Sequence, residues 1–583
     1  MEGELSFCGK EAARYVAASL PLIIQSDGTL LLDESHPDYE QALGALRPIA
    51  ELGKKPGRWH TYRLTPVSLW NAAASGETAE RVLENLRRFA RYGIPASVER
   101  EIRERMDNYG RFRLVRRPEG LFLLADSPER LRLASEWPEV AACLAPSPAN
   151  VDAALCVRPE MRGALKSALA ARGMPALDEA GYEQGGALRV AWRRVSAGGK
   201  PVALRAYQEE AVDAFLDGRA GGEGSGVVVL PCGAGKTWVG IGAMVRLGCE
   251  TLILTPNAVS VSQWIREILD NTTLMPEDVG EYSGQRKQVR PVTVATYQVL
   301  ARKSSPAGEN AAHSLLMGRN WGLIIYDEVH LLPAPVFRLT ARLQAARRLG
   351  LTATLVREDG RETEVFALIG PKKYELPWKA GESEGWIAQA ECTEIRVPLD
   401  PAAAWRYRGA SPRSRHRIAG ENPAKGEAVR RLLERHRGEK ALVIGQYLDQ
   451  LKRLAKELDL PLVTGEMPHH ARQEMFDRFN RGEIAALVVS KVANFAVDLP
   501  DASVAIQISG SFGSRQEEAQ RLGRILRPKP GGGRAFFYSV VSEGTEEEEF
   551  ARNRRRFLIE QGYVYRLEAW RPVEAGAPEG VSV

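Results

Sequence analysis

The stretch that decides the fold is Leu230-Pro231-Cys232-Gly233-Ala234-Gly235-Lys236-Thr237. It follows an apolar run at 227–229 that predicts a buried strand and precedes a run at 238–244 that predicts a packed helix. Backbone N–H groups of such a loop and the N-terminus of the helix face one anion together, so the context predicts a phosphate-binding loop. Leu230 stands where the full pattern has a glycine. The alternative is a tight strand-to-helix turn with an incidental lysine.

Two side chains of this loop fit the chemistry of a nucleotide. Lys236 would reach the β- and γ-phosphates, and the Thr237 hydroxyl would bind Mg²⁺. Upstream, the Gln208 amide offers one donor and one acceptor, a pair that can read an adenine edge, although this residue alone does not decide the matter. The residues expected to bind the nucleotide are Arg205, Gln208, Gly233, Ala234, Gly235, Lys236 and Thr237.

A pair of acidic residues, Asp327 and Glu328, ends the apolar run 323–326. The strand ends of a parallel sheet meet at one edge, so this pair is expected beside the phosphate loop. Asp327 would hold Mg²⁺, and Glu328 would position and activate the attacking water. His330 follows them and would relay the nucleotide state toward a second lobe. The alternative is a capped strand end.

The bulk composition bounds the kind of protein. A chain of 583 residues predicts three or four domains, and 44% hydrophobic residues suffice for several cores. The net charge of +5 is compatible with binding to nucleic acid but does not prove it. Six scattered cysteines form no C-x-x-C pair, the N-terminus lacks the basic start of a signal peptide, and no apolar run is long enough for a membrane span. We therefore expect a cytoplasmic protein with reduced thiols and no membrane partner.

Strand and helix patterns alternate from about residue 201 onward, which predicts parallel sheets covered on both faces. A polar connector at 377–385 interrupts the alternation and is a hinge candidate. Two such lobes joined by a hinge predict a cleft that opens and closes on nucleotide. The strands are expected at 227–230, 251–255, 292–295, 323–326 and 349–352 in the first lobe, and at 441–444, 462–464, 486–490, 504–508 and 535–540 in the second.

Smaller elements precede the lobes, so the fold class is α/β with additional domains at the N-terminal end. The elements expected there are a helix from Pro66 to Ala74 capped by Thr65, a hairpin at 112–124, a strand at 151–157, a helix at 158–172 and a strand at 188–192. The expected divisions are an α+β N-terminal domain at 1–146, a small α/β domain at 147–198, lobes at 199–380 and 381–570, and a tail at 571–583.

The second lobe carries two basic features. Arg524 and Arg527 are three residues apart, so one helical face can hold both, and a closing lobe can supply such an arginine to phosphoryl transfer. The alternative is a solvated helix with charge pairs. A basic stretch at 405–426 has little apolar period and is either a solvated, partly disordered insert or a phosphate-tracking arm. The arginines expected to contact DNA phosphates there are Arg413, Arg415 and Arg417.

The motifs in this order resemble those of superfamily-two helicases, and more closely those of the XPB family in a bacterial form. Arg357, Glu358 and Asp359, which follow Thr352-Ala353-Thr354 after two further residues, are the mark of that family. The resemblance runs from about residue 21 to about residue 566. The stretches that carry it are 60–66, 230–237, 327–330, 350–359, 495–500 and 520–524.

The resemblance implies an ATP-dependent 3′-to-5′ DNA helicase of nucleotide excision repair, built on two RecA-like lobes with ATP and Mg²⁺ as cofactors. It implies that 147–198 is a damage-recognition-like domain and that 405–426 is the counterpart of a thumb insertion. The partners would be DNA and, as for some members of the family, a nuclease or another repair protein. The catalytic residues would be Lys236, Asp327, Glu328, Gln520, Arg524 and Arg527, and the coupling residues His330, Thr352 and Thr354.

The triplet of Arg357, Glu358 and Asp359 has two interpretations. Its carboxylates repel the DNA backbone and would wedge a duplex apart, or the triplet is a salt-bridged surface loop. The activity has alternatives as well: a motor on duplex DNA that remodels without processive strand separation, an RNA helicase, or a scaffold whose ATP site gates binding. The complete catalytic set speaks against the scaffold.

Overall fold

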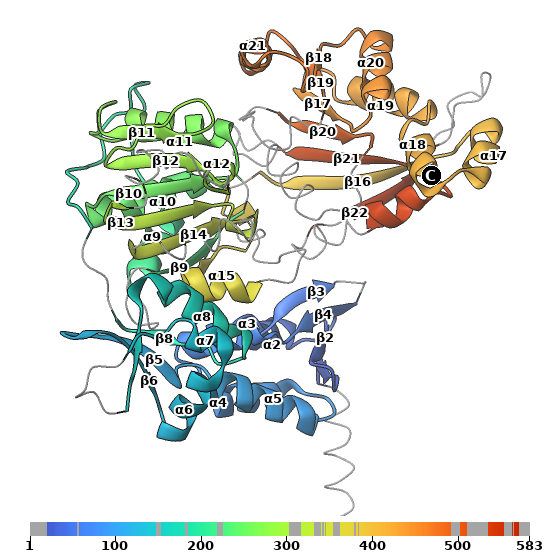
Figure 1. The fold of residues 1–583 in the computed structure, drawn as a ribbon. Coiled ribbons are helices and arrows are strands. Elements are labelled where there is room, and N and C mark those ends of the chain that lie inside the picture. The colour runs from blue at the N-terminus through green and yellow to red at the C-terminus, as the bar shows by residue number, and fades with distance from the viewer. Residues whose placement is uncertain are drawn as a thin grey trace, which may run out of the picture. The chain divides into compact units, whose positions relative to one another are not determined.

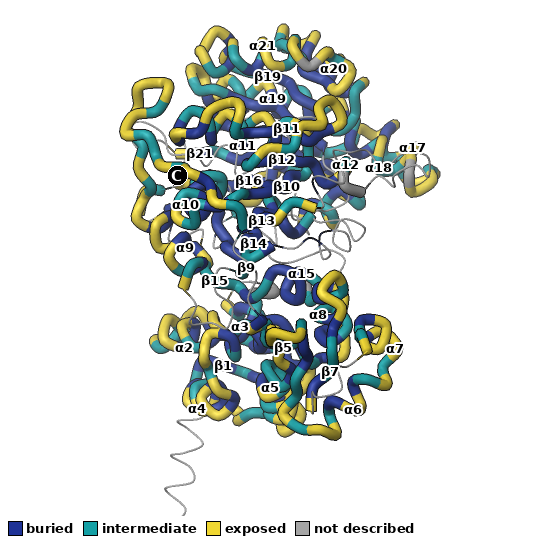
Figure 2. Tube along the Cα trace, turned by 60° about the vertical axis from the view of Figure 1, so that its left-hand side comes forward, coloured by how far each residue is buried: buried dark blue, intermediate teal, exposed yellow. Residues whose placement is uncertain are grey.

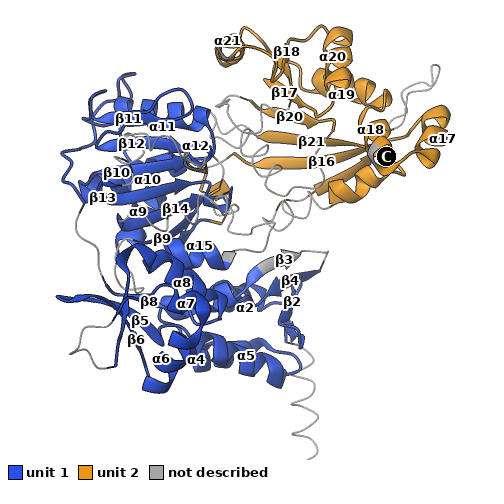
Figure 3. Ribbon diagram, in the orientation of Figure 1, with its two compact units in different colours: residues 1–230, 235–376 blue, residues 231–234, 377–583 orange. Residues whose placement is uncertain are grey.

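The computed structural model describes most of the chain, and its ribbon is shown in Figure 1. The strands of its sheets are largely buried (Figure 2). The chain divides into two compact units, residues 1–230 with 235–376 and residues 231–234 with 377–583, drawn in two colours in Figure 3. The described residues are 20–54, 58–146, 153–180, 185–217, 225–231, 233–301, 316, 318–331, 340, 343, 345–353, 362–377, 381–382, 384–386, 388–490, 502–509, 534–552, 563 and 565–570. Within these ranges, no helix is long and apolar enough to cross a membrane.

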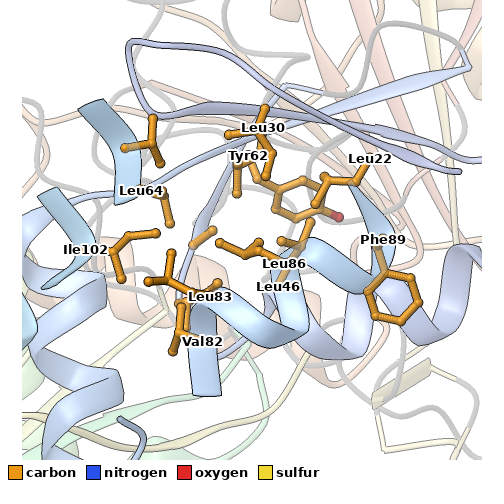
Figure 4. Packing of buried hydrophobic residues seen from close by; sticks show 14 of the residues in the cluster. Leu22, Leu30, Leu46, Tyr62, Leu64, Val82, Leu83, Leu86, Phe89 and Ile102 are labelled. Atoms are coloured by element: carbon orange, nitrogen blue, oxygen red, sulfur yellow. The ribbon is translucent and has the colours of Figure 1, made fainter. Parts of the chain in front are cut away.

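The first unit begins with a four-stranded antiparallel sheet in the order β1-β2-β4-β3. Its elements are β1 (Leu22–Ile24), β2 (Thr29–Asp33), α2 (Tyr39–Leu46), β3 (Glu51–Lys54), β4 (Trp59–Arg63), α3 (Pro66–Ala74), α4 (Ala79–Phe89) and α5 (Ala96–Asp107). Figure 4 shows Leu86 of α4 packed toward Tyr62 of β4 in the apolar core between helices and sheet. The Thr65 hydroxyl accepts a hydrogen bond from Ser68 N at 3.0 Å, which confirms the predicted start of α3.

A second small sheet follows in the same unit, in the order β7-β6-β5-β8. Its elements are β5 (Phe112–Arg117), β6 (Gly120–Ala125), α6 (Pro128–Glu136), α7 (Pro138–Ala141), β7 (Leu155–Val157), α8 (Arg162–Ala171) and β8 (Leu177–Asp178). β5 and β6 form the predicted hairpin, while β7 pairs antiparallel with β6 and β8 pairs parallel with β5. The sheet therefore spans residue 146, where the sequence predicted a change of domain.

The strand predicted at 188–192 is wrong. The segment forms only isolated bridges, Ala187 with Cys249 and Trp192 with Thr272. Its partners lie where helices of the first lobe end, and such positions offer no continuous strand edge for a ladder. The segment thus runs along the first lobe and adds no strand to the small sheet.

The first lobe is a seven-stranded parallel sheet in the order β11-β12-β10-β13-β14-β9-β15. Its elements are α9 (Ala206–Leu216), β9 (Ser225–Val229), α10 (Lys236–Leu247), β10 (Thr251–Thr255), α11 (Ala258–Asn271), β11 (Val279–Tyr282), β12 (Val292–Thr296), α12 (Tyr297–Ala301), β13 (Trp321–Asp327), β14 (Ala345–Thr352), α15 (Glu362–Ile369) and β15 (Lys372–Glu375). All five predicted strands are present, and β11 and β15 extend the sheet. Because β13, β14 and β9 are adjacent and parallel, the chain leaves their carboxyl ends at one edge.

The second lobe is another seven-stranded parallel sheet, in the order β18-β19-β17-β20-β21-β16-β22. Its elements are β16 (Ala390–Val397), α17 (Pro401–Gly409), α18 (Pro412–Gly420), α19 (Ala424–Arg435), β17 (Ala441–Ile444), α20 (Leu448–Glu457), β18 (Leu462–Val463), α21 (His469–Asn480), β19 (Ala486–Val489), β20 (Val504–Gln507), β21 (Ala535–Ser542) and β22 (Tyr565–Ala569). The α/β class with two parallel-sheet lobes is confirmed. The basic stretch 405–426 is helical in α17, α18 and the start of α19, which overturns the interpretation as a partly disordered insert.

Helices α3 and α8 of the N-terminal elements pack against α15 of the first lobe. The ring centroids of Trp70 and Phe366 are 5.5 Å apart, and Asn71 Oδ1 accepts a hydrogen bond from Lys372 N at 2.8 Å. We call this contact the α3–α15 seam. Its buried apolar residues are Val67, Trp70, Ala170, Phe366 and Ala367.

Candidate functional site

The loop after β9 contains glycines in the left-handed backbone region. Gly233 and Gly235 have φ angles of +84° and +78°, which a residue without Cβ adopts readily. A Cβ on Gly235 would lie 2.5 Å from Gln208 Nε2, so a larger residue at this position would have to displace the end of the Gln208 side chain. Helix α10 begins at Lys236, so the loop leads directly into a helix N-terminus, where unpaired N–H groups attract an anion.

Lys236 forms an ion pair with Glu328 at the carboxyl edge of the sheet. Lys236 Nζ lies 2.6 Å from Glu328 Oε1, and the two side chains are only 11% and 17% exposed. Glu328 has a φ of +49°, a region that residues with a Cβ rarely adopt, and such strain clusters at functional sites. The turn after β13 thus holds a carboxylate against the lysine of the phosphate loop.

Asp327, the last residue of β13, is held by two aromatic side chains. Trp264 Nε1 donates to Asp327 Oδ2 at 3.0 Å, and the Tyr297 hydroxyl donates to the Asp327 carbonyl at 2.7 Å. Burial, and then the charge of Glu328, raises the pKa of Asp327 to about 6. Burial also pushes the pKa of Glu328 upward, but the charge of Lys236 leads the opposing contributions, which together lower it. The pair therefore favours an ionised Glu328 next to a carboxyl group that binds a proton more readily.

A chain of contacts connects Glu328 to the entry of the phosphate loop. His330 Nδ1 lies 3.5 Å from Glu328 Oε2 and 2.7 Å from Thr352 Oγ1. The Thr352 carbonyl accepts a hydrogen bond from Leu230 N at 2.9 Å. A shift of Glu328 can therefore reach the end of β14 and the start of the loop through two side chains.

Gln208 and Thr237 lie on the two helices next to the loop. Gln208 is buried, and its Oε1 accepts a hydrogen bond from Arg205 N at 2.9 Å. Thr237 lies in the first turn of α10. Mg²⁺ takes one or two protein oxygens and otherwise water and phosphate, so the Thr237 hydroxyl and the Asp327 carboxylate are a donor set that fits it. The described part of the chain has no larger group of His, Cys, Asp and Glu that could hold a metal.

Several predicted site residues have no described side-chain placement. Their roles stay predictions. Those outside the described residues are Thr354, Arg357, Glu358, Asp359, Gln520, Arg524 and Arg527. The side chain of Arg413, whose backbone lies in α18, belongs to the same group.

The other two arginines of the arm are engaged with carboxylates of their own lobe. Arg415 Nη1 lies 3.5 Å from Glu546 Oε1. Arg417 Nη2 lies 2.6 Å from Asp449 Oδ2. These ion pairs neutralise part of the positive charge of two arginines that were predicted to contact DNA phosphates.

Sequence reasoning missed Trp264 and Tyr297. Val261, Trp264 and Ile268 recur at helical spacing in α11, a pattern that indicates burial and nothing more. The partner of the Trp264 N–H lies on β13, far away in the sequence, so no local signal identifies it.

Three family models match separate parts of the chain. The model of the ERCC3/RAD25/XPB C-terminal helicase matches residues 382–573. The model of the type III restriction enzyme res subunit matches residues 201–357. A model of a helicase conserved C-terminal domain matches residues 22–147.

Curated relatives are similar over nearly the whole chain. The DNA 3′-5′ helicase XPB of Kineococcus radiotolerans is 50% identical over 568 residues, covering 97% of this chain and 99% of the relative. The protein of the same name from Mycobacterium tuberculosis is 50% identical over 547 residues, covering 94% and 97%. The general transcription and DNA repair factor IIH helicase/translocase subunit XPB/SSL2 of Saccharomyces cerevisiae is 31% identical, covering 94% and 72%. Among solved structures, the Pyrococcus furiosus Hef helicase domain is 18% identical with a TM-score of 0.41, covering 60% of this chain and 98% of that one.

Proposed function

The chain belongs to the XPB family of DNA helicases, and we propose that it is an ATP-driven DNA 3′-5′ helicase that acts in DNA repair. The observation that carries this function is the Lys236–Glu328 pair, with Asp327 next to it, at the carboxyl edge of the first sheet. A phosphate-loop lysine and two carboxylates at a strand end of the same sheet are the groups that transfer of a phosphoryl group to water requires.

Each of these groups has a separate task in the proposed reaction. Lys236 binds the β- and γ-phosphates, and Thr237 and Asp327 would hold Mg²⁺, which offsets the phosphate charge when bound. Trp264 fixes the orientation of the Asp327 carboxylate through its N–H group. When Lys236 turns to the phosphates, Glu328 loses its ion-pair partner and becomes the base that orients a water and accepts its proton.

Other roles are proposed from the sequence and the family. Gln208 reads the adenine, and an arginine of the second lobe, Arg524 or Arg527, stabilises the charge of the transferring phosphate with Gln520 nearby. The segments 147–198 and 405–426 act on DNA as damage-recognition-like and thumb-like elements. A nuclease or another repair protein is the proposed protein partner, and a cytoplasmic location is expected.

The test is ATP hydrolysis with single-stranded, duplex and forked DNA and with RNA, together with strand displacement on 3′-tailed and 5′-tailed duplexes. We expect DNA to stimulate hydrolysis and only the 3′-tailed duplex to be opened. Lys236→Ala should abolish both activities. Glu328→Gln should retain Mg-ATP binding and lose turnover, because the metal ligand Asp327 remains. The matched control is Glu277→Gln, an exposed carboxylate of the same lobe, which should leave both activities unchanged.

Two outcomes would change the proposal. Near-parental hydrolysis by Glu328→Gln would remove the water-orienting role from this residue. Hydrolysis on duplex DNA without strand displacement would favour a translocase, a term that the name of the Saccharomyces cerevisiae relative also contains.

A further inference from the structure

Trp405 on α17 is 78% exposed, which is the highest value among the large hydrophobic side chains that the structure describes. Exposure of the apolar surface of an indole to water costs free energy, and tryptophan is usually largely buried. Figures 1 and 2 both place α17 at the rim of its unit, away from the strands of the sheet. The exposure of Trp405 therefore calls for an explanation beyond packing.

The helix that carries Trp405 is firmly attached to the second lobe. Asp400 caps α17 by accepting a hydrogen bond from Ala403 N at 2.8 Å. Ala403 is buried, and the Tyr407 hydroxyl accepts a hydrogen bond from Glu546 N at 2.7 Å. Ala403 and Tyr407 are four residues apart and share the inner face of the helix. Trp405 lies between them in sequence and so projects from the opposite face of a fixed element.

The surroundings of Trp405 are cationic and uncrowded. Arg408 follows three residues later and shares its face, and Arg406 is adjacent. Both arginines are exposed, and neither forms an ion pair with a described residue. Ala402 and Gly409, three residues before and four after Trp405, are too small to cover the ring.

We propose that Trp405 stacks on an unpaired base of single-stranded DNA while Arg406 and Arg408 contact the neighbouring phosphates. An exposed aromatic ring next to cations is the arrangement that binds single strands, because every base has a face for stacking and every nucleotide carries a charge. In a duplex the base faces are covered by their neighbours, so this surface selects the separated strand. The inference rests on the proposed helicase function and deepens it by assigning a contact for the separated strand to α17.

The decisive test compares full-length parent and Trp405→Ala in binding an oligothymidine and the same oligonucleotide with abasic positions. One aromatic–base stack favours the intact strand by roughly 5-fold to 150-fold. We expect Trp405→Ala to lower the ratio of the two affinities by about that factor and Trp405→Tyr to restore most of it. Tyr92→Ala, at a residue of the N-terminal elements that is 76% exposed, is the matched control and should leave the ratio unchanged.

The arginines are tested by the salt dependence of the same binding. Arg406→Gln with Arg408→Gln should reduce the slope of log K against log salt by about 1.4, at about 0.7 for each phosphate contact on a single strand, while the preference for intact bases persists. Arg417→Gln should change the slope less, since Arg417 is paired with Asp449.

The inference is overturned if Trp405→Ala keeps the parental preference for intact bases, or if it weakens duplex binding as much as single-strand binding. The second result would point to a groove contact or to a protein partner. These outcomes are separate from a failure of the proposed function, because a parent protein without DNA-stimulated hydrolysis would refute the helicase whatever Trp405 does.

Discussion

His330 Nδ1 lies 2.7 Å from Thr352 Oγ1, and both side chains are buried. His330 follows β13, and Thr352 is the last residue of the neighbouring parallel strand β14. The bond therefore links the strand end next to Glu328 with the strand end that leads toward Thr354. A change at the carboxylate of Glu328, the proposed base, thus has a direct physical route to the segment that the family resemblance assigns to DNA.

Thr352→Val should uncouple hydrolysis from strand separation. The substitution keeps the shape of the side chain but removes the hydroxyl that pairs with His330 Nδ1, and loss of a buried hydrogen bond costs about 1 to 3 kcal/mol. We expect fewer base pairs opened per ATP hydrolysed, with basal hydrolysis close to that of the parent. The control is Thr293→Val, at a buried threonine of β12 whose hydroxyl accepts a hydrogen bond from Arg290 N and donates one to the Arg290 carbonyl. Equal losses in both variants would mean a general packing defect.

Arg524→Ala should leave nucleotide affinity nearly unchanged, because the phosphate loop lies in the first lobe. Loss of an arginine finger lowers turnover by about 10³-fold to 10⁵-fold. Equilibrium binding of a fluorescent ATP analogue and single-turnover hydrolysis measure the two quantities. If affinity and turnover fell together, Arg524 would be a ground-state contact.

Lys425→Met should destabilise the second lobe. Lys425 is 1% exposed, and its Nζ donates to Glu547 Oε2 at 2.7 Å and to the Ile508 carbonyl at 2.8 Å. Removing one partner of a buried ion pair costs about 3 to 5 kcal/mol, since the other charge is left buried and unpaired. Urea unfolding should show this loss, and Lys425→Met with Glu547→Gln should recover much of it. The exposed pair of Arg417 and Asp449 is the control, worth at most about 1 kcal/mol.

Asp178→Asn should lower the free energy of unfolding at neutral pH and make that free energy less dependent on pH. Burial opposes ionisation of Asp178, but the charges of Lys166 and Arg162 outweigh it and lower its pKa to about 2. A pKa that is lower in the folded state gives stability above the unfolded pKa near 4, and this stability is lost as the pH falls toward 2. The difference in unfolding free energy between parent and variant should be about 2 kcal/mol at pH 7 and should shrink below pH 4. A difference that stayed constant with pH would show that charge is not the cause.

The parallel sheets were predictable because their strands are buried on both faces and read as short apolar runs. β16 and β22 were missed because they do not read as apolar runs. β16 carries Glu394 and Arg396, which pair with each other at 3.1 Å, and β22 is an edge strand whose side chains are mostly exposed. Charged strands of this kind have no apolar run, so only the sheet around them reveals their conformation.

The same distinction applies to the candidate site. Lys236, Asp327 and Glu328 were found because phosphate chemistry imposes a local pattern of residues next to a strand or helix. Trp264 was not found because an aromatic residue at helical spacing indicates a core position and nothing more. Trp405 was not found because it begins a basic stretch with little apolar period, in which a single aromatic residue gives no sign of its surroundings. Only the tertiary structure shows that one indole serves Asp327 and that the other faces solvent.

The α3–α15 seam has a practical consequence for dissecting the protein. A fragment that began near residue 199 would retain Phe366 and Ala367 of α15 but lose Val67, Trp70 and Ala170, which cover them. The bare apolar strip would favour self-association of the isolated motor. Recombinant fragments of the two lobes should therefore stay soluble only when Phe366 and Ala367 of the strip are replaced by polar residues or when the N-terminal elements are supplied in trans.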